Sequence, residues 1–313
     1  MRRTAAFKIS VTAITAALIS GCSFDSIGVV DVYDDAYLLE LQQALTESDL
    51  VSHTDIAPEF YERAQNIPPI VAEVILEPAA DIASVAPLIA AVTEVSVSHG
   101  EDVPALVFTA NGEDLTSLGF SGRLSADDAD AVVDHVVNRG WSAAEVSVPT
   151  GGEPFLRIQA TIDTMADADA LVSAANAPLP APLTGAQIHQ WVQVAEARFV
   201  RDIRVAGMPI SAELMSTLAA IDALPHPVRS DLAQPQLSIS SALRLGTGEY
   251  IMNARVAASP EQYRGLEADE RRELARADGY TAFCAEVDRL MQLVPEMPIS
   301  GTDCRVGGST IEY

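Results

Sequence analysis

The chain has 313 residues and a formal net charge of −25, with 44 acidic side chains against 19 lysines and arginines. Hydrophobic residues make up 49% of it and charged residues 20%, so it can bury a sizeable core and does not have the composition of a disordered chain. The strong negative charge excludes general nucleic-acid binding, because affinity for a phosphate backbone comes from cationic side chains. The length fits two domains or one array of repeats.

The first 22 residues have the composition of an export signal. Three cations, Arg2, Arg3 and Lys8, precede an apolar run over 9–19 that is too short to span a bilayer as a helix. The run ends in Leu-Ile-Ser-Gly-Cys at 18–22, which resembles the lipobox of bacterial lipoproteins. An ordinary signal peptide with a chance cysteine, or a short anchor helix, remains the alternative.

The lipobox resemblance implies export, transfer of a lipid to the thiol of Cys22, and cleavage that removes residues 1–21 as a signal peptide. It also implies that the protein is held at the membrane by this lipid, on the outer face of the cytoplasmic membrane. Lys8 is the only lysine of the chain. Such exclusive use of arginine resembles the codon bias of a high-GC organism such as an actinobacterium.

Residues 22–65 are expected to form a tether that contains a short helix. Within this segment, Leu38, Leu41 and Leu45 form a half-apolar stripe that predicts a helix near Ala36–Leu45.

Five later helices are predicted from residues that favour helix N-caps, followed by apolar residues at helical spacing. The candidate caps are Ser84, Ser125, Thr164, Ser211 and Ser259, and they are separated by 41, 39, 47 and 48 residues. Asp128 lies three residues after Ser125, as in a capping box. The segment after Ser259 has one long apolar stripe from Phe283 to Val294 and predicts a long final helix.

Each of the first four of these five helices is followed by two predicted strands that are joined by turn residues. The predicted pairs are 105–110 with 115–124, 144–148 with 155–162, 188–194 with 199–205, and 237–245 with 250–257, and a closing strand is expected near 304–311. The chain therefore repeats a helix–strand–strand unit with a period in the forties, which is a sign of repeat architecture.

The predicted fold class is α+β, with tandem units forming ferredoxin-like (βαββαβ) modules. Such modules have an antiparallel sheet with helices on one face. The proline-rich stretch at 178–186 is the best boundary, with a first module at 66–177 and a second at 187–313. Whether the strands form one continuous sheet or two is left open by the pattern.

One strand-to-helix joint, Gly119-Phe-Ser-Gly-Arg-Leu-Ser-Ala-Asp-Asp128, resembles the corresponding joint of BON modules of bacterial envelopes. The other joints match it loosely, and the glycine expected in the second half of that pattern is missing. This resemblance implies a non-catalytic module associated with the envelope.

Two cysteines, Cys284 and Cys304, follow the lipobox cysteine, and neither belongs to a CxxC pattern. In an exported chain an even remainder of cysteines indicates a disulfide. We therefore expect Cys284 and Cys304 to be bonded to each other.

No motif of a known catalytic or cofactor site is present. The five histidines lie at least 36 residues apart, and P-loop, dinucleotide-binding and GxSxG patterns are absent. We therefore predict no catalytic residues and no cofactor. Trp141 and Trp191 are expected to be structural, with carbohydrate stacking as the less favoured alternative.

Acidic residues cluster at Asp127, Asp128 and Asp130, which makes these the candidate metal ligands. The cluster lacks the glycine and glutamate of a calcium-binding EF-hand loop. It falls in the first turn of a predicted helix, where carboxylates interact favourably with the helix dipole. We therefore expect a helix start and no metal site.

Two functions from different classes remain. The favoured one is a lipid-anchored, non-catalytic binding or scaffold protein of the cell envelope, whose partner is an envelope protein or a glycan. The alternative is an exported hydrolase in which two carboxylates, for instance Glu153 and Asp163, converge in the fold. A pair of carboxylates about 5–10 Å apart would favour the hydrolase.

Overall fold

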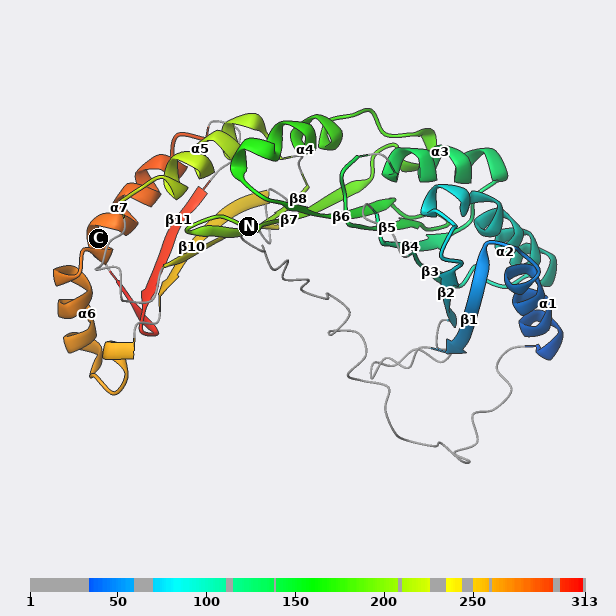
Figure 1. Cartoon of the computed structure of the whole chain (residues 1–313), viewed down its shortest axis with the longest axis horizontal. Helices are drawn as coiled ribbons and strands as arrows, with labels where there is room; N and C mark the ends of the chain where they lie inside the picture. The colour runs from blue at the N-terminus through cyan, green and yellow to red at the C-terminus, as the bar shows by residue number, and fades with distance from the viewer. Residues whose placement is uncertain are drawn as a thin grey trace, which may run out of the picture.

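The computed structural model describes residues 34–58, 70–110, 115–137, 139–207, 210–225, 235–243, 250–258, 261–294 and 299–311. Within these residues twelve strands form one sheet, and their order across the sheet is their order along the chain (Figure 1). The strands are β1 (Val51–Pro58), β2 (Ile70–Leu76), β3 (Ala105–Thr109), β4 (Ser117–Gly122), β5 (Ala143–Val148), β6 (Phe155–Ile162), β7 (Gln187–Val194), β8 (Val200–Ala206), β9 (Gln236–Leu243), β10 (Tyr250–Ala258), β11 (Ile299–Val306) and β12 (Ser309–Thr310).

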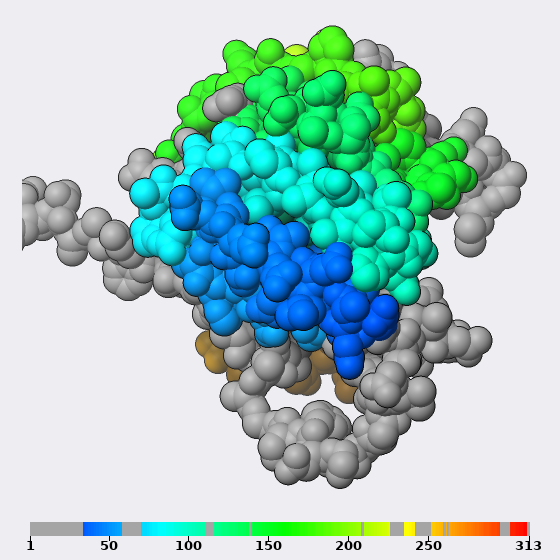
Figure 2. Space-filling model, turned by 90° about the vertical axis from the view of Figure 1, so that its right-hand side faces the viewer, coloured from blue at the N-terminus to red at the C-terminus, as the bar shows by residue number. Residues whose placement is uncertain are grey.

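Helices connect successive hairpins and follow the outer, convex side of a curved sheet (Figure 1). The α-helices are α1 (Asp35–Thr46), α2 (Ala86–His99), α3 (Ala126–Val136), α4 (Ala168–Ala175), α5 (Ala212–Asp222), α6 (Ala268–Ala277) and α7 (Tyr280–Met291). Short 3-10 turns are η2 (Ile82–Ser84), η3 (Met165–Asp167), η4 (Ala181–Leu183) and η5 (Glu261–Tyr263). In the space-filling view from the α1 end, α1, α2 and α3 succeed one another across this side (Figure 2).

The chain is α+β and repeats the predicted helix–strand–strand unit six times, from α1–β1–β2 to α6–α7–β11–β12. Within a unit the two strands form an antiparallel hairpin, as in β5 with β6. Between units the strands pair in parallel, as in β4 with β5. The sheet is therefore mixed, and the expectation of an antiparallel sheet was wrong.

The expected ferredoxin-like modules are not found in the described sheet either. In a βαββαβ module the two strands that a helix connects are not neighbours in the sheet, because another strand of the module lies between them. Here each strand that follows a helix pairs directly with the strand before that helix, as in β2 with β3. The sequence pattern gives the four hairpins from β3 to β10 and their period, but not the position where the next strand pairs.

The face of the sheet toward the helices forms one continuous hydrophobic core. Alternate residues of each strand point to this face, and on β2 these are Ile70, Ala72, Val74 and Leu76, all buried. The sheet continues across the proline-rich stretch 178–186, because β6 pairs with β7 over its whole length. It also includes β1, which lies within the segment expected to be a tether.

The predicted caps at Ser125 and Ser211 are confirmed. The Ser125 side chain accepts a hydrogen bond from the Asp128 amide at 3.2 Å, and the Ser211 side chain accepts one from the Leu214 amide at 3.1 Å. Thr164 forms a capping box with Asp167, which begins a 3-10 turn before α4. These side chains satisfy amides that have no partner inside the helix.

Other helix starts differ from the prediction. Ser84 does not cap α2; it lies in the 3-10 turn before it, and Asp81 caps that turn. Ser259 lies outside the described residues. The single long final helix is divided into α6 and α7 at Gly279, whose φ of 84° is easily adopted only by glycine. The one closing strand is two, β11 and β12.

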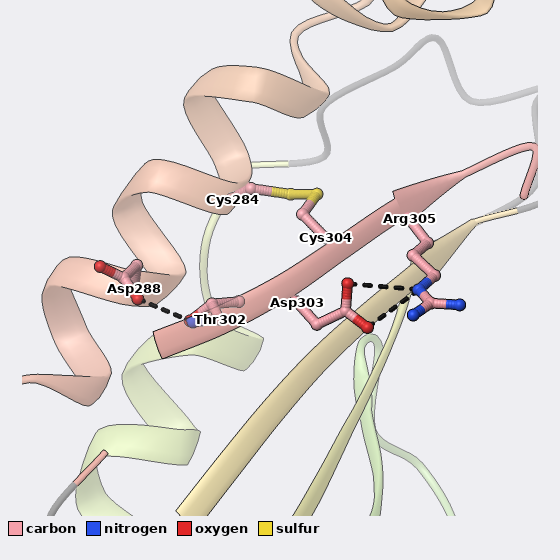
Figure 3. The surroundings of a disulfide bond; sticks show 6 residues. All are labelled: Cys284, Asp288, Thr302, Asp303, Cys304 and Arg305. Atoms are coloured by element: carbon pink, nitrogen blue, oxygen red, sulfur yellow. Dashed lines mark hydrogen bonds and ion pairs between the residues drawn. A yellow bond between two sulfur atoms is a disulfide. The ribbon is translucent and has the colours of Figure 1, made fainter. Parts of the chain in front are cut away.

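The expected disulfide between Cys284 and Cys304 is present and joins α7 to β11 (Figure 3). The two Cα atoms are 6.1 Å apart, and both residues are buried. Four residues later on α7, Asp288 accepts a hydrogen bond from the Thr302 amide at 3.0 Å. The last helix is therefore held to the last long strand by a covalent bond and a charge-assisted hydrogen bond.

The packing of α3 gives a direct test of the repeat. Val133 is buried against the sheet and Asp130 on the same helix is exposed. We expect Val133→Asp to lower the free energy of unfolding by about 3 kcal/mol or more, since it buries an unpaired charge. Asp130→Ala should change it by about 0.5 kcal/mol or less. Urea unfolding measures both, and similar effects at the two positions would contradict the orientation of α3.

Candidate functional site

The sheet face opposite the helices, here called the open face, carries a hollow of about 740 Å³. Its lining comes from strands β3 to β9, which corresponds to roughly 29 Å across the sheet at the usual strand spacing. Small residues form its floor, among them Gly119 on β4 and Ala143 on β5. Larger polar and aromatic side chains on β6, β7 and β8 form one side. The size and shape suit an elongated ligand.

Gly119 keeps the floor open. A Cβ atom added there would lie 3.4 Å from the Cγ of Glu145, which is an ordinary contact distance. Its strand neighbours Leu118 and Phe120 point into the core. A side chain at position 119 would therefore project into the hollow without straining the backbone.

Trp191, Arg204 and Asp202 form the first polar cluster of the open face. Trp191 on β7 lies opposite Arg204 on β8, and the guanidinium carbon of Arg204 is 4.4 Å from the centre of the indole ring. The indole nitrogen donates a hydrogen bond to Asp202, and Nε of Arg204 lies 3.2 Å from an oxygen of the same carboxylate. Ring and carboxylate together fix the plane of the guanidinium.

A second cluster lies on β5, β6 and β7 and consists of Glu145, Phe155, Arg157 and His189. Nη1 of Arg157 donates to Glu145 at 2.7 Å, and the guanidinium carbon lies 5.4 Å from the Phe155 ring centre. The Phe155 ring also meets the His189 ring edge to face at 4.8 Å. Desolvation and the nearby Arg157 lower the pKa of His189, against the opposing effect of Glu145. The His189 ring is thus biased toward its neutral form.

The arginines of both ion pairs are more than half exposed, with Arg157 at 54% and Arg204 at 58%, and Asp202 is 30% exposed. Exposed ion pairs contribute at most about 1 kcal/mol to stability. The ion pairs therefore matter for the orientation of the side chains, because each pair restrains an arginine that would otherwise sample many rotamers. The sheet thus presents two oriented guanidinium groups on one face.

The candidate metal ligands Asp127, Asp128 and Asp130 lie in the first turns of α3, as expected for a helix start. Asp128 accepts a hydrogen bond from the Ser125 hydroxyl at 2.7 Å. Among the described residues, no group of three or more His, Cys, Asp or Glu side chains has the arrangement of a metal site.

Glu153 and Asp163, the carboxylates named for a hydrolase, do not converge. Glu153 precedes β6 and Asp163 follows it, so a strand of eight residues separates them by roughly 30 Å. Glu153 accepts a hydrogen bond from Gln187 at 2.8 Å. On the open face, the register places the Cα atoms of Glu145 and Asp202 roughly 19 Å apart. Neither pair has the spacing of a glycosidase.

His135 is the most buried of the histidines that the structure describes, with 5% of its surface exposed. Arg139 donates to its Nδ1 at 3.3 Å, and the Trp141 ring lies edge to face at 6.1 Å. Burial, and secondarily the charge of Arg139, lower the pKa of His135 to about 4. The ring is neutral and belongs to the core between α3 and β5.

The two arginine clusters were not predicted from the sequence. Trp191 was placed correctly on a strand, but its partners Arg204 and Asp202 come from the next strand and could be matched only with the register. A signal was present in β7, where His189, Trp191 and Gln193 alternate with residues of the core. That alternation marks a face that carries large polar side chains.

Cys22, the predicted lipid attachment site, lies outside the described residues. Within the part of the chain that is described, no helix has the length and apolar character needed to cross a membrane. Comparison with protein-family models, with curated proteins and with solved structures gives no match.

The low pKa of His135 predicts a loss of stability in acid. The unfolded chain binds a proton near pH 6.5 and the folded chain only near pH 4, so the folded state is penalised as the pH falls between these values. The penalty amounts to about 3 kcal/mol once the pH is below both values.

We therefore expect His135→Gln to reduce the fall in unfolding free energy between pH 7 and pH 4.5 by about 2–3 kcal/mol. Chemical denaturation at the two pH values measures this fall. His53→Gln, at an exposed position of β1, is the matched control and should leave the fall unchanged. An identical fall in wild type and His135→Gln would contradict the buried neutral ring.

Proposed function

We propose that the protein is a lipid-anchored, non-catalytic binding module of the cell envelope, and that the open face of its sheet holds the ligand. The observation that carries this proposal is the hollow with its two oriented arginines, on a face that the helices leave uncovered. A sheet face that served only folding would not need stacked arginines, since exposed ion pairs add little stability. The lipobox supports the location.

The anchoring and the curved sheet fit one another in this proposal. A lipid on Cys22 holds the chain at the membrane through a residue that precedes α1 in the sequence. The open face of the sheet is then presented to a polymer of the envelope. The hydrolase alternative has no supporting pair of carboxylates at Glu153 and Asp163 or at Glu145 and Asp202.

Cys22→Ser tests the anchor. In the wild type, labelled palmitate should be incorporated and the protein should fractionate with the membrane, because only the thiol accepts the lipid. The variant should take up no label and should appear in the medium or as an uncleaved precursor. Equal labelling of the two proteins would contradict the lipid anchor.

Gly119→Trp tests the hollow. We expect the indole to fill the floor, so that binding of the chain from residue 23 onward to a purified cell-envelope fraction falls at least tenfold in a co-sedimentation assay. Thr161→Trp places the same side chain at an exposed position of β6 outside the hollow lining and should bind as the wild type does. Unchanged binding by Gly119→Trp, with an unchanged circular dichroism spectrum, would contradict the proposed site.

A further inference from the structure

Arg204 presents a fixed pair of hydrogen-bond donors to the hollow. Its Nε is directed at Asp202 and its guanidinium plane lies over Trp191. Its Nη1 and Nη2 have no hydrogen-bond partner among the residues that the structure describes, and the residue lines the hollow. Two parallel N–H groups held in one plane match the two oxygens of a carboxylate.

The charge of the lining is unusual for this chain. The protein as a whole carries −25, yet at the hollow each arginine has one carboxylate partner. Glu145 pairs with Arg157, and Asp202 pairs with Arg204. An anionic group therefore meets no local excess of negative charge there, while the field of the whole chain repels a long, densely charged polyanion such as a nucleic acid. A short ligand with one carboxylate on each of a few units satisfies both conditions.

The backbone of the hollow cannot pair with a peptide. Each strand from β3 to β9 is paired on both sides, so its amides and carbonyls are engaged, and a peptide could not add to the sheet as a further strand. The groups that remain are side chains such as Gln159, Ser117 and Ser240. Amide and hydroxyl groups over a floor of small residues suit the hydroxyls and apolar ring faces of sugars.

From these observations we infer that the hollow binds an acidic glycan, a saccharide chain whose carboxylates are taken by the Nη edge of Arg204. Arg157 is the second, weaker position, because Glu145 already occupies its Nη1. Trp191 and Asp202 act as positioning residues that hold Arg204. This inference rests on the proposed function of the open face as a ligand-binding surface.

The test uses an oligogalacturonate, an oligosaccharide with one carboxylate per unit, and the same oligosaccharide with its carboxylates fully methyl-esterified. Isothermal titration calorimetry at low salt with the chain from residue 23 onward should show binding of the acid. The ester should bind at least tenfold more weakly, because it keeps the sugar rings and removes the charge.

Arg204→Gln should weaken binding of the acid at least tenfold, and Arg204→Lys should restore only part of it, because lysine keeps the charge without the planar fork. Arg305→Gln is the matched control: Arg305 on β11 is likewise paired with an aspartate two residues earlier, Asp303, but it lies outside the hollow lining (Figure 3). It should leave the affinity unchanged.

Equal affinity for acid and ester, or failure of the acid to bind, would overturn the assignment of an acidic glycan. Tighter binding of an oligo-aspartate of the same length than of the oligogalacturonate would overturn it in favour of an acidic peptide. The proposed function is tested apart from this by Gly119→Trp and the envelope fraction. If that variant loses envelope binding while the acid fails to bind, the hollow is the site and only its ligand has been assigned wrongly.

Discussion

All helices of the repeat pack on one side of the sheet, and the rest of the structure depends on this one-sided packing (Figure 1). Two strands occupy about 9.6 Å of sheet, and neighbouring helices pack at about 8–10 Å. One helix therefore covers one hairpin, and the two layers stay in step from unit to unit. This match of widths lets six units form one sheet with a single core.

The same constraint creates the open face. Since the crossovers place helices on one side only, every second residue of the strands faces away from the core. On β6, β7 and β8 these positions carry the large side chains of Phe155, Arg157, Trp191 and Arg204. On β4 the same face carries Gly119, which leaves a gap between these side chains and β3. Residues of the core and residues of the site thus alternate along the same strands, and the site needs no insertion or additional domain.

The first and last units of the repeat differ from the units in the middle of the sheet. At one end α1 packs on α2 and brings β1 to the edge. At the other, α7 is held to β11 by the disulfide between Cys284 and Cys304, and the edge strand β12 has only two residues. A terminal repeat lacks one neighbour and loses the stability that the neighbour would supply. A covalent bond in the last unit offsets this loss.

Much of the architecture could be predicted from the sequence because it depends on local chemistry. Caps such as Ser125 and Ser211, the alternating strands and the spacing of about 40 residues are all properties of nearby residues. The strand order could not be predicted, since it depends on where β3 pairs after α2 has crossed the sheet. The site was missed for the same reason: Trp191 and Arg204 meet only through the register of β7 and β8. The β1 strand was missed because His53 and Asp55 interrupt its apolar pattern.

One face of the sheet is closed by helices and the other is open, and the two tryptophans report on this difference directly. Trp141 is 2% exposed beneath the helices, and Trp191 is partly exposed on the open face. The variants Trp141→Phe and Trp191→Phe each leave one indole, whose fluorescence can be quenched with acrylamide. The structure predicts strong quenching when Trp191 remains and weak quenching when Trp141 remains. Equal protection of the two indoles would mean that the open face is covered and would contradict the one-sided packing of the helices.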